Sequence, residues 1–179
     1  MENIRTTVEE IQNLLKLLQT NQEKLVEKFG DQVSTFATDT DILSFETLAA
    51  NNLKVIQFLY DELGFTFLTD LCGVNYPDQK DAEIVVVYHL HNFIENIRVR
   101  LSIAVPVEKP DVFTASKLFE SANWMERETY DFFGVNFIGH SNLKRILNVD
   151  EMDYFPLRKE FPLEDQTRID KDDEMFGRG

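Results

Sequence analysis

The sequence predicts an α+β domain: an open four- to five-stranded sheet with helices packed on one side, followed by an extended C-terminal tail. Three observations predict it. Apolar residues recur every three or four positions near the N-terminus, apolar and polar residues alternate in the middle of the chain, and both periods are lost after Gly139. At 179 residues the chain suits one domain with an appendage, which we place at 1–140 and 141–179.

Two helices are expected in the first part of the chain. The first covers residues 7–28, starts at the capping box Thr7-Val8-Glu9-Glu10 and is ended by Gly30. The second covers residues 47–63 and is capped by Gly64. Their apolar faces are expected to comprise Val8, Ile11, Leu15 and Leu18 in the first helix and Leu53, Ile56, Tyr60 and Leu63 in the second.

Five strands are expected, each bounded by residues that favour turns. They cover residues 32–37, 42–46, 65–74, 82–91 and 96–104. In the last strand, polar and apolar side chains alternate, which suits a sheet with one solvated face. The polar set is Arg98, Arg100 and Ser102, and the apolar set is Ile97, Val99, Leu101 and Ile103.

The composition argues against several classes of function. The chain carries 32 acidic and 18 basic residues, a formal net charge of -14, which opposes binding to nucleic acid and direct adsorption to anionic lipid. A single cysteine, Cys72, permits no internal disulfide and cannot supply the four thiolates of an iron–sulfur cluster. No apolar run approaches the ~18 residues of a membrane helix, and no secretory signal is present, so a cytosolic protein is expected.

Local motifs give little indication of chemistry. The glycines do not have the spacing of a nucleotide-binding loop, and no nucleophile elbow occurs. His89 and His91 lie two apart on an expected strand and can share a face as metal ligands. A polar strand face is the favoured interpretation, because no third ligand has a suitable spacing. Cys72 lies among apolar residues, which favours a small buried side chain over a reactive thiol.

The densest pattern runs from Asn123 to Gly134, where three carboxylates and one arginine stand among four aromatic rings. We expect a third helix that ends at Gly134, with Ser121 or Asn123 as the cap of its last part. Helical spacing groups the side chains into three faces with apolar groups on each, which implies burial on more than one side. The faces are Trp124, Glu128 and Asp131; Glu126, Tyr130 and Phe133; and Met125, Thr129 and Phe132.

Asp131 stands in the last turn of this helix, where the macrodipole disfavours an anion, so cations are expected nearby. The candidates are Arg127, Arg145, Arg158 and Lys159. Three interpretations stay open from the residues alone. The carboxylates Glu128 and Asp131 can act as an acid–base pair, form an internal ion-pair network that holds the tail, or meet arginines of a partner.

These residues resemble the C subunits of proton-pumping NADH:quinone oxidoreductases (respiratory complex I), the family that includes the mitochondrial iron–sulfur protein 3 subunit. The resemblance covers roughly residues 40 to 165. It rests on a run that begins at Glu126 and on a second run after Pro156, with further likeness at residues 68–77 and 87–90. The matching positions are Glu126, Arg127, Glu128, Tyr130, Asp131, Phe133, Gly134, Val135, Phe137, Gly139, His140, Leu143, Arg145, Ile146, Leu147, Pro156, Leu157, Arg158, Lys159, Glu160 and Phe161. Ser141 stands where the family usually has proline, which leaves the charged pattern intact.

The resemblance implies a non-catalytic structural subunit of the hydrophilic arm of this complex. The complex transfers electrons from NADH to quinone and pumps protons, and its members of this family carry no flavin, cluster or catalytic residue of their own. The implied partners are subunits B and D and other hydrophilic-arm subunits, which hold the flavin, the iron–sulfur clusters and the quinone site. The implied location is peripheral, on the cytoplasmic side of the bacterial inner membrane, with only indirect membrane contact. The charged residues are then expected to lock helix and tail together, and the tail to pack on partners.

Two alternatives remain. The chain can be the equivalent subunit of a related membrane-bound [NiFe] hydrogenase or formate hydrogenlyase, whose homologues carry a similar helix motif. It can also be a free-standing acid–base enzyme that uses Glu128 and Asp131.

Overall fold

The computed structural model describes residues 2–38 and 42–161, with side chains from residue 11 onward. Its main sheet has five strands in the order β1-β2-β5-β4-β3. The strands are β1 (Val33–Ala37), β2 (Ile42–Thr47), β3 (Phe67–Asn75), β4 (Ile84–Asn92) and β5 (Ile97–Val105). The β2–β5 pair is parallel and the other three pairs are antiparallel. The α+β class and the five-stranded open sheet are therefore confirmed.

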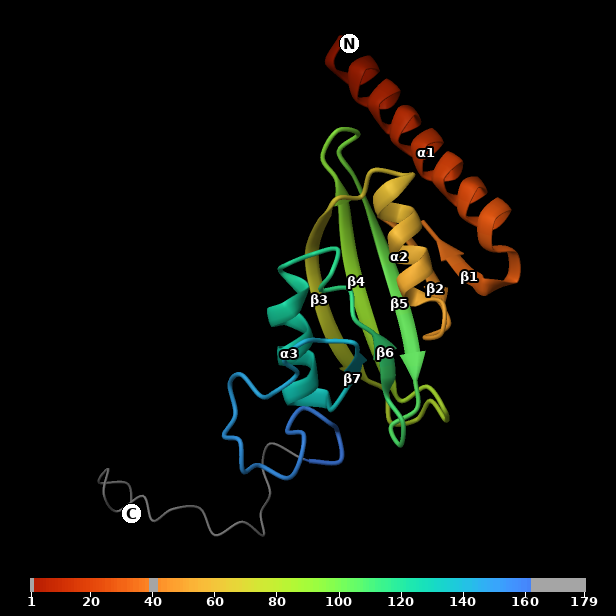
Figure 1. Ribbon diagram of the computed structural model, residues 1–179. Coiled ribbons are helices and arrows are strands. Elements are labelled where there is room, and N and C mark those ends of the chain that lie inside the picture. Colours follow the sequence, from red (N-terminus) through yellow and green to blue (C-terminus); the bar gives the residue numbers. More distant parts are fainter. Residues whose placement is uncertain (1, 39–41, 162–179) are drawn as a thin grey trace, which may run out of the picture.

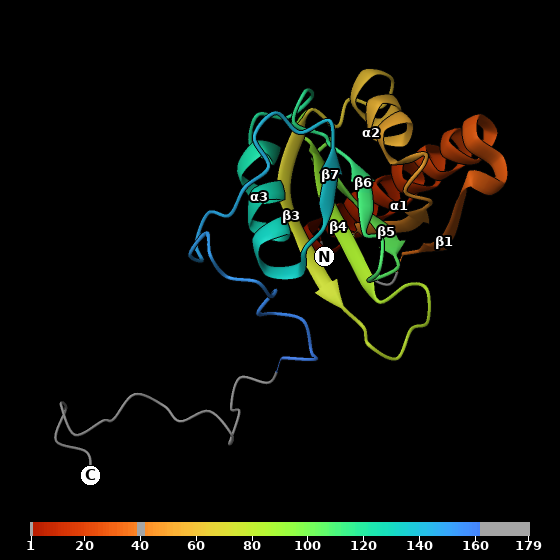
Figure 2. The same cartoon turned by 60° about the horizontal axis from the view of Figure 1, so that its bottom comes forward.

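Three α-helices and a second, two-stranded sheet complete the described chain. The helices are α1 (Glu2–Phe29), α2 (Asn52–Asp61) and α3 (Ala122–Phe133), and a short 3-10 turn, Gly30–Gln32, follows α1. The second sheet pairs β6 (Asp111–Phe113) in parallel with β7 (Asn136–Ile138). Figures 1 and 2 show α2, α3 and the β6–β7 pair on the same side of the main sheet. This small sheet was not predicted, because each of its strands has only three residues.

The core lies between the main sheet and these elements. Alternate residues of β5 are buried, among them Val99 and Leu101, while Arg98 is exposed and Arg100 half-buried on the opposite face. The predicted period of two in this strand is confirmed. On β4 the buried set includes Val86, Tyr88 and Leu90. The same side chains therefore define one apolar face and one partly solvated face of the sheet.

The first helix begins earlier than predicted. It is already helical at Glu2, so Thr7 to Glu10 lie inside the helix and do not form a capping box. Nothing between residues 2 and 7 breaks a helix, since glycine and proline are absent there. Ile11 and Leu15 are exposed and Leu18 is buried, while the side chain of Val8 lies outside the described residues. The N-terminal half of α1 projects beyond the sheet in Figure 1, which leaves the predicted stripe there uncovered.

The second helix is shorter than predicted and presents a different face. It starts at Asn52, because residues 48–51 form a turn closed by a 2.9 Å hydrogen bond from the Asn51 N–H to the Leu48 carbonyl. Its buried apolar residues are Val55, Ile56 and Leu59. Of the predicted face, Ile56 and Leu63 are buried, whereas Leu53 and Tyr60 are only half-buried. The predicted turn at residues 38–41 lies largely outside the described residues.

Candidate functional site

Helix α3 packs on β3, and a glycine makes this close approach possible. A Cβ added to Gly73 would lie 2.5 Å from the ring of Phe133. The helix ends at Gly134, which has a φ of 78° in the left-handed region. This end of the helix was predicted correctly. Ser121 is the residue before the first turn, but its side chain makes no capping hydrogen bond.

The buried side chains of α3 are mostly polar. Glu126, Arg127, Thr129 and Asp131 are all buried. Trp124, Glu128 and Asp131 were predicted to share one face of the helix, but they differ in burial. Trp124 and Glu128 are exposed, while Asp131 is fully buried. Asp131 is covered because residues 145–148 pack against it.

Asp131 is enclosed by hydrogen-bond donors from this covering segment. One carboxylate oxygen, Oδ1, is 2.8 Å from Nη1 of Arg145 and 3.1 Å from Nδ2 of Asn148. The other, Oδ2, accepts the backbone N–H groups of Ile146, Leu147 and Asn148 at 3.1, 2.8 and 2.9 Å. Burial by itself raises the pKa of the Asp131 carboxyl, but hydrogen bonds outweigh it and the net pKa lies well below the usual range. The donors are Asn148, Arg145, Leu147 and Ile146.

Arg145 extends the same network into the tail. Its Nη1 also donates to the backbone carbonyl of Asp131 at 2.9 Å. Its Nη2 donates to the carbonyls of Met152 and Tyr154 at 2.7 and 2.9 Å. Its guanidinium lies 5.2 Å from the ring centre of Phe155, within the range of a cation–π contact. One buried arginine therefore joins α3 to two later points of the chain.

Two of the other predicted cations, Arg127 and Arg158, bind carbonyl groups rather than Asp131. Arg127 donates to the carbonyls of Lys144 and Arg145 at 3.1 and 2.9 Å and lies over the ring of Trp124. Arg158 donates to the carbonyl of Phe133 at 2.8 Å, at the C-terminal end of α3 where the macrodipole favours a cation. Of the four candidates, only Arg145 pairs directly with Asp131 in the described structure.

Gly134 is the second glycine whose missing side chain matters. A Cβ there would lie 2.5 Å from Phe155 and 2.6 Å from Arg158, in addition to the strain of the positive φ. The described part of the predicted tail, residues 141–161, thus packs against the end of α3. We call the group formed by Arg127, Asp131, Arg145, Asn148 and Arg158 the α3 clasp.

Glu126 is also fully buried on α3, but its surroundings differ. Its carboxylate accepts the hydroxyl of Thr114 and the backbone N–H of Ala115, the latter at 2.7 Å. Burial raises the pKa of Glu126 to about 7, against the lowering effect of these two hydrogen bonds. No local signal in the sequence identified Thr114 as a partner of this carboxylate.

The ring of His140 lies beside Glu126, with Nε2 4.0 Å from Oε2. The backbone N–H of Asn142 donates to Nδ1 of this ring at 3.0 Å, so Nδ1 carries no proton. Nε2 then holds the proton and donates to the carbonyl of Asn123 at 3.1 Å. His140 is therefore a neutral imidazole and offers Glu126 no positive charge.

The remaining predicted residues lie around this cluster. The backbone N–H of Leu157, after Pro156, donates to the carbonyl of Phe132 at 3.2 Å. The backbone N–H of Lys159 donates to the side chain of Asn75 at 2.8 Å. Tyr130 meets the ring of Phe155 edge-on at 6.0 Å between ring centres. Gly139, with a φ of 86°, turns the chain just before His140.

The residues weighed for metal binding and thiol chemistry lie on the opposite face of the sheet. Nε2 of His89 accepts Nε–H of Arg100 at 2.9 Å, and Nε2 of His91 is 3.4 Å from Oδ1 of Asn96. Among the described residues, no group of three His, Cys, Asp or Glu is arranged to hold a metal ion. Burial and the adjacent Asp70 raise the pKa of the half-buried Cys72 thiol. The two histidines thus have other partners, and the thiol is not activated.

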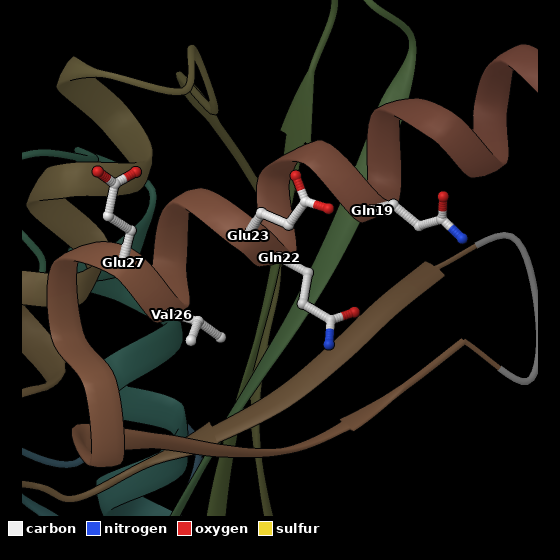
Figure 3. Close-up of a pocket in the computed structure, with 5 residues that line it drawn as sticks. All are labelled: Gln19, Gln22, Glu23, Val26 and Glu27. Atoms are coloured by element: carbon white, nitrogen blue, oxygen red, sulfur yellow. The ribbon is translucent and has the colours of Figure 1, made fainter.

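A hollow of about 630 Å³ lies beside α1 and is drawn in Figure 3. Gln22 and Val26 point toward the β1–β2 hairpin in this view, and the carboxylates of Glu23 and Glu27 point away from it. All of its lining residues come from the one helix. The hollow therefore brings no nucleophile and base together. No helix in the part of the chain that the structure describes is long and apolar enough to span a membrane.

Comparisons with known proteins agree with this geometry. The family model described as respiratory-chain NADH dehydrogenase, 30 Kd subunit, matches residues 45–167, which include the whole α3 clasp. The C subunit of NADH-quinone oxidoreductase from Rhizobium rhizogenes is 37% identical and aligns with 83% of this chain and 74% of its own length. The protein of the same name from Citrifermentans bemidjiense is 36% identical, with 81% and 89% coverage.

A solved structure shows the same architecture. The trypsin-resistant fragment of Nqo5, residues 1–134, superposes with a TM-score of 0.60 at 30% identity. The superposition covers 71% of this chain and 99% of that fragment. Sequence and structure thus lead to the same family, and the resemblance inferred from the motif is confirmed. The chain belongs to the family of the 30 kDa subunit of respiratory-chain NADH dehydrogenase.

Proposed function

We propose that this chain is a non-catalytic structural subunit in the hydrophilic arm of an NADH-quinone oxidoreductase. The observation that carries the proposal is the family match over residues 45–167, a range that includes the α3 clasp. The relatives named above are subunits of NADH-quinone oxidoreductase, which favours this complex over the hydrogenase alternative. The chain then contributes to a redox enzyme through assembly, while the electron transfer takes place in other subunits.

The geometry of the charged residues supports a structural role. Asp131 is saturated with donors and has a depressed pKa, so it is a poor proton acceptor at neutral pH. Glu128, by contrast, is exposed to solvent, whereas Asp131 is fully buried. The acid–base pair of Glu128 and Asp131 therefore lacks the convergent geometry that such catalysis needs.

We further propose which subunits neighbour this chain, which subunits hold the cofactors, and where the chain is located. Subunits B and D are the proposed neighbours, and the flavin, the iron–sulfur clusters and the quinone are assigned to other subunits. The proposed position is peripheral, on the cytoplasmic side of the bacterial inner membrane. The net charge of -14 supports attachment through proteins rather than through anionic lipid.

Purification of the complex through an affinity tag on this chain tests the proposal. Mild detergent extraction should yield a particle with NADH:quinone oxidoreductase activity, and mass spectrometry should identify flavin- and cluster-binding subunits in it. Recovery of hydrogenase subunits instead would contradict the assignment. Turnover by the isolated chain that Glu128→Gln abolishes without unfolding would contradict the non-catalytic role.

The tail offers a second test of the structural role. Deletion of every residue after Pro156 removes Arg158 but keeps the Asp131–Arg145 pair, so the domain should still fold. We expect this truncated chain to be absent from the assembled complex. Deletion of residues 162–179 alone separates the contribution of the chain end from that of the Arg158 contact. Normal assembly of both truncated chains would refute a role of the tail.

A further inference from the structure

Three apolar side chains gather at one end of the main sheet, where the β4–β5 turn meets the start of β3. Phe67, Phe93 and Ile94 are 46%, 60% and 95% exposed. The rings of Phe67 and Phe93 are in contact, with 5.0 Å between their centres. A single exposed apolar residue is ordinary, but an adjoining group on a protruding turn is typical of a contact surface.

The turn that carries this group is held rigidly. Oδ1 of the buried Asn92 accepts the backbone N–H groups of Ile94 and Glu95 at 2.9 and 3.1 Å. Its Nδ2 donates to the carbonyl of Leu63 at 2.9 Å, which fastens the turn to the end of α2. Ile94 is thus presented in one conformation, and binding through it costs little conformational entropy.

Two arginines lie beside the rings on the same face of the sheet. Phe67 and Arg98 flank His91 in register, and the ring of His91 is 4.4 Å from that of Phe93. Arg98 is exposed, and Arg100 follows it one row further along β5. The aromatic rings and the two arginines are therefore neighbours on this face of the sheet.

Neither arginine has a carboxylate within 4.0 Å among the described residues. Two carboxylates of this face lie away from both guanidinium groups: Glu46 accepts the hydroxyl of Thr35 at 3.1 Å, and Asp70 lies 3.8 Å from Nδ1 of His89, beyond hydrogen-bond distance. Arg100 is fixed through its Nε by His89, and the two terminal nitrogens of its guanidinium make no hydrogen bond in the described structure. A groove of about 460 Å³ runs along this part of the face, and its lining includes Arg100, Ser102 and Glu46.

We infer that Phe67, Phe93, Ile94, Arg98 and Arg100 form a docking surface for a segment of another subunit, one that offers apolar side chains to the rings and a carboxylate to the arginines. Aromatic residues and arginine are the types that dominate binding energy at protein interfaces. The unpaired guanidinium of Arg100 is shaped for a carboxylate. A second copy of this chain would set arginine against arginine, and a net charge of -14 opposes an anionic membrane. The inference rests on the proposed function and assigns a surface to it.

Charge and apolar substitutions with matched controls test the surface in cells that express the full chain with a tag. Ile94→Asp and Arg98→Glu should each lower the fraction of the chain found in the complex by about tenfold or more. The controls Leu48→Asp and Lys80→Glu make the same chemical changes at exposed residues near the other end of the sheet and should leave incorporation within about twofold. Thermal unfolding of each purified chain verifies that the exposed substitutions leave the fold intact.

Equal incorporation of Ile94→Asp and wild type would overturn the docking surface while leaving the proposed function in place. Absence of the wild-type chain from any NADH-quinone oxidoreductase would contradict the proposed function, and the docking surface would fall with it. A photo-crosslinking residue at position 94 then identifies the occupant. Capture of a peptide with acidic and apolar residues from another subunit supports the inference, whereas capture of lipid or of a second copy overturns it.

Discussion

Glu126 and Asp131 are two fully buried carboxylates on the same helix, yet their surroundings shift their pKa values in opposite directions. Asp131 faces a guanidinium and four further N–H donors, which hold its pKa well below the usual range. Glu126 has one hydroxyl, one N–H and a neutral imidazole beside it, and its pKa is raised to about 7. Burial alone therefore does not determine the state of a buried acid, because the number of donors and the presence of a cation decide it.

The largest expected effect is the loss of the Asp131 charge. Asp131→Asn keeps the shape of the side chain but leaves Arg145 buried without a counterion. The free energy of unfolding should therefore fall by about 3–5 kcal/mol. Urea denaturation at pH 7 measures the change. Glu128→Gln, the same carboxyl-to-amide exchange at an exposed site of the same helix, should stay within about 0.5 kcal/mol. Similar losses from the two variants would show that the clasp does not depend on this charge.

The second largest expected effect is the contribution of Glu126 to the free energy of unfolding, which should depend on pH. Between about pH 4.5 and 7 the folded chain holds a proton on Glu126 that the unfolded chain has released, so stability falls as pH rises through this window. The total loss is on the order of 3 kcal/mol and is complete above pH 7. Asp131 contributes no slope there, since its depressed pKa keeps it ionised in the folded state and the unfolded carboxyl titrates below this window.

Glu126→Gln isolates this contribution. The amide resembles the protonated acid, since it can accept the N–H of Ala115 and donate to the Thr114 oxygen. Denaturation curves from pH 5 to 8 should lose the slope, and the variant should be more stable than the wild type at pH 8. A variant as pH-dependent as the wild type would locate the titrating group elsewhere.

Arg145→Lys tests the geometry of the cation on the Asp131 side. One ammonium cannot reach the carboxylate of Asp131 and the carbonyls of Met152 and Tyr154 together, so a loss of about 2 kcal/mol is expected. Limited proteolysis should also cut residues 149–161 faster. Lys144→Arg is the reverse exchange at the exposed neighbouring position and serves as control. Unchanged stability and cleavage rate in Arg145→Lys would mean that positive charge alone suffices.

The smallest expected effect concerns the hydroxyl that supports Glu126. Thr114→Val keeps the side-chain shape and removes one donor from the carboxylate, which should cost about 1 kcal/mol. The cost should be greater at pH 8 than at pH 5, because hydrogen bonds to an ionised group are the stronger ones. An equal cost at both pH values would indicate that Glu126 is never ionised in the folded chain.

Some partners of the two buried carboxylates could be predicted from the sequence, and others could not. The macrodipole conflict at Asp131 pointed to a cation, and Arg145 was one of the four candidates. The sequence did not predict that Arg127 and Arg158 donate to backbone carbonyls. Every residue has a carbonyl, so no residue pattern marks the ones that an arginine will bind. Thr114 and Asn148 were missed for a similar reason: a hydroxyl or amide in a loop has many uses, and only the folded position selects one.

The same limit applies to the helices. Glycine and periodicity located the C-terminal end of α3, and the ends of the strands to within two residues, since both depend on neighbours within a few residues. The predicted starts of α1 and α2 were wrong, and so was half of the predicted buried face of α2, because contacts with the rest of the molecule decide these features.

By itself the sequence determined the α+β class, the alternation of β5, the left-handed turn at Gly134 and the family of the chain. These properties arise from local conformational preference and from a long run of specific residues. Only the tertiary structure decided that one buried acid of α3 is fully paired and the other is not. That difference depends on donors brought from residues 114–115 and 145–148, and packing alone sets their distance from the two carboxylates.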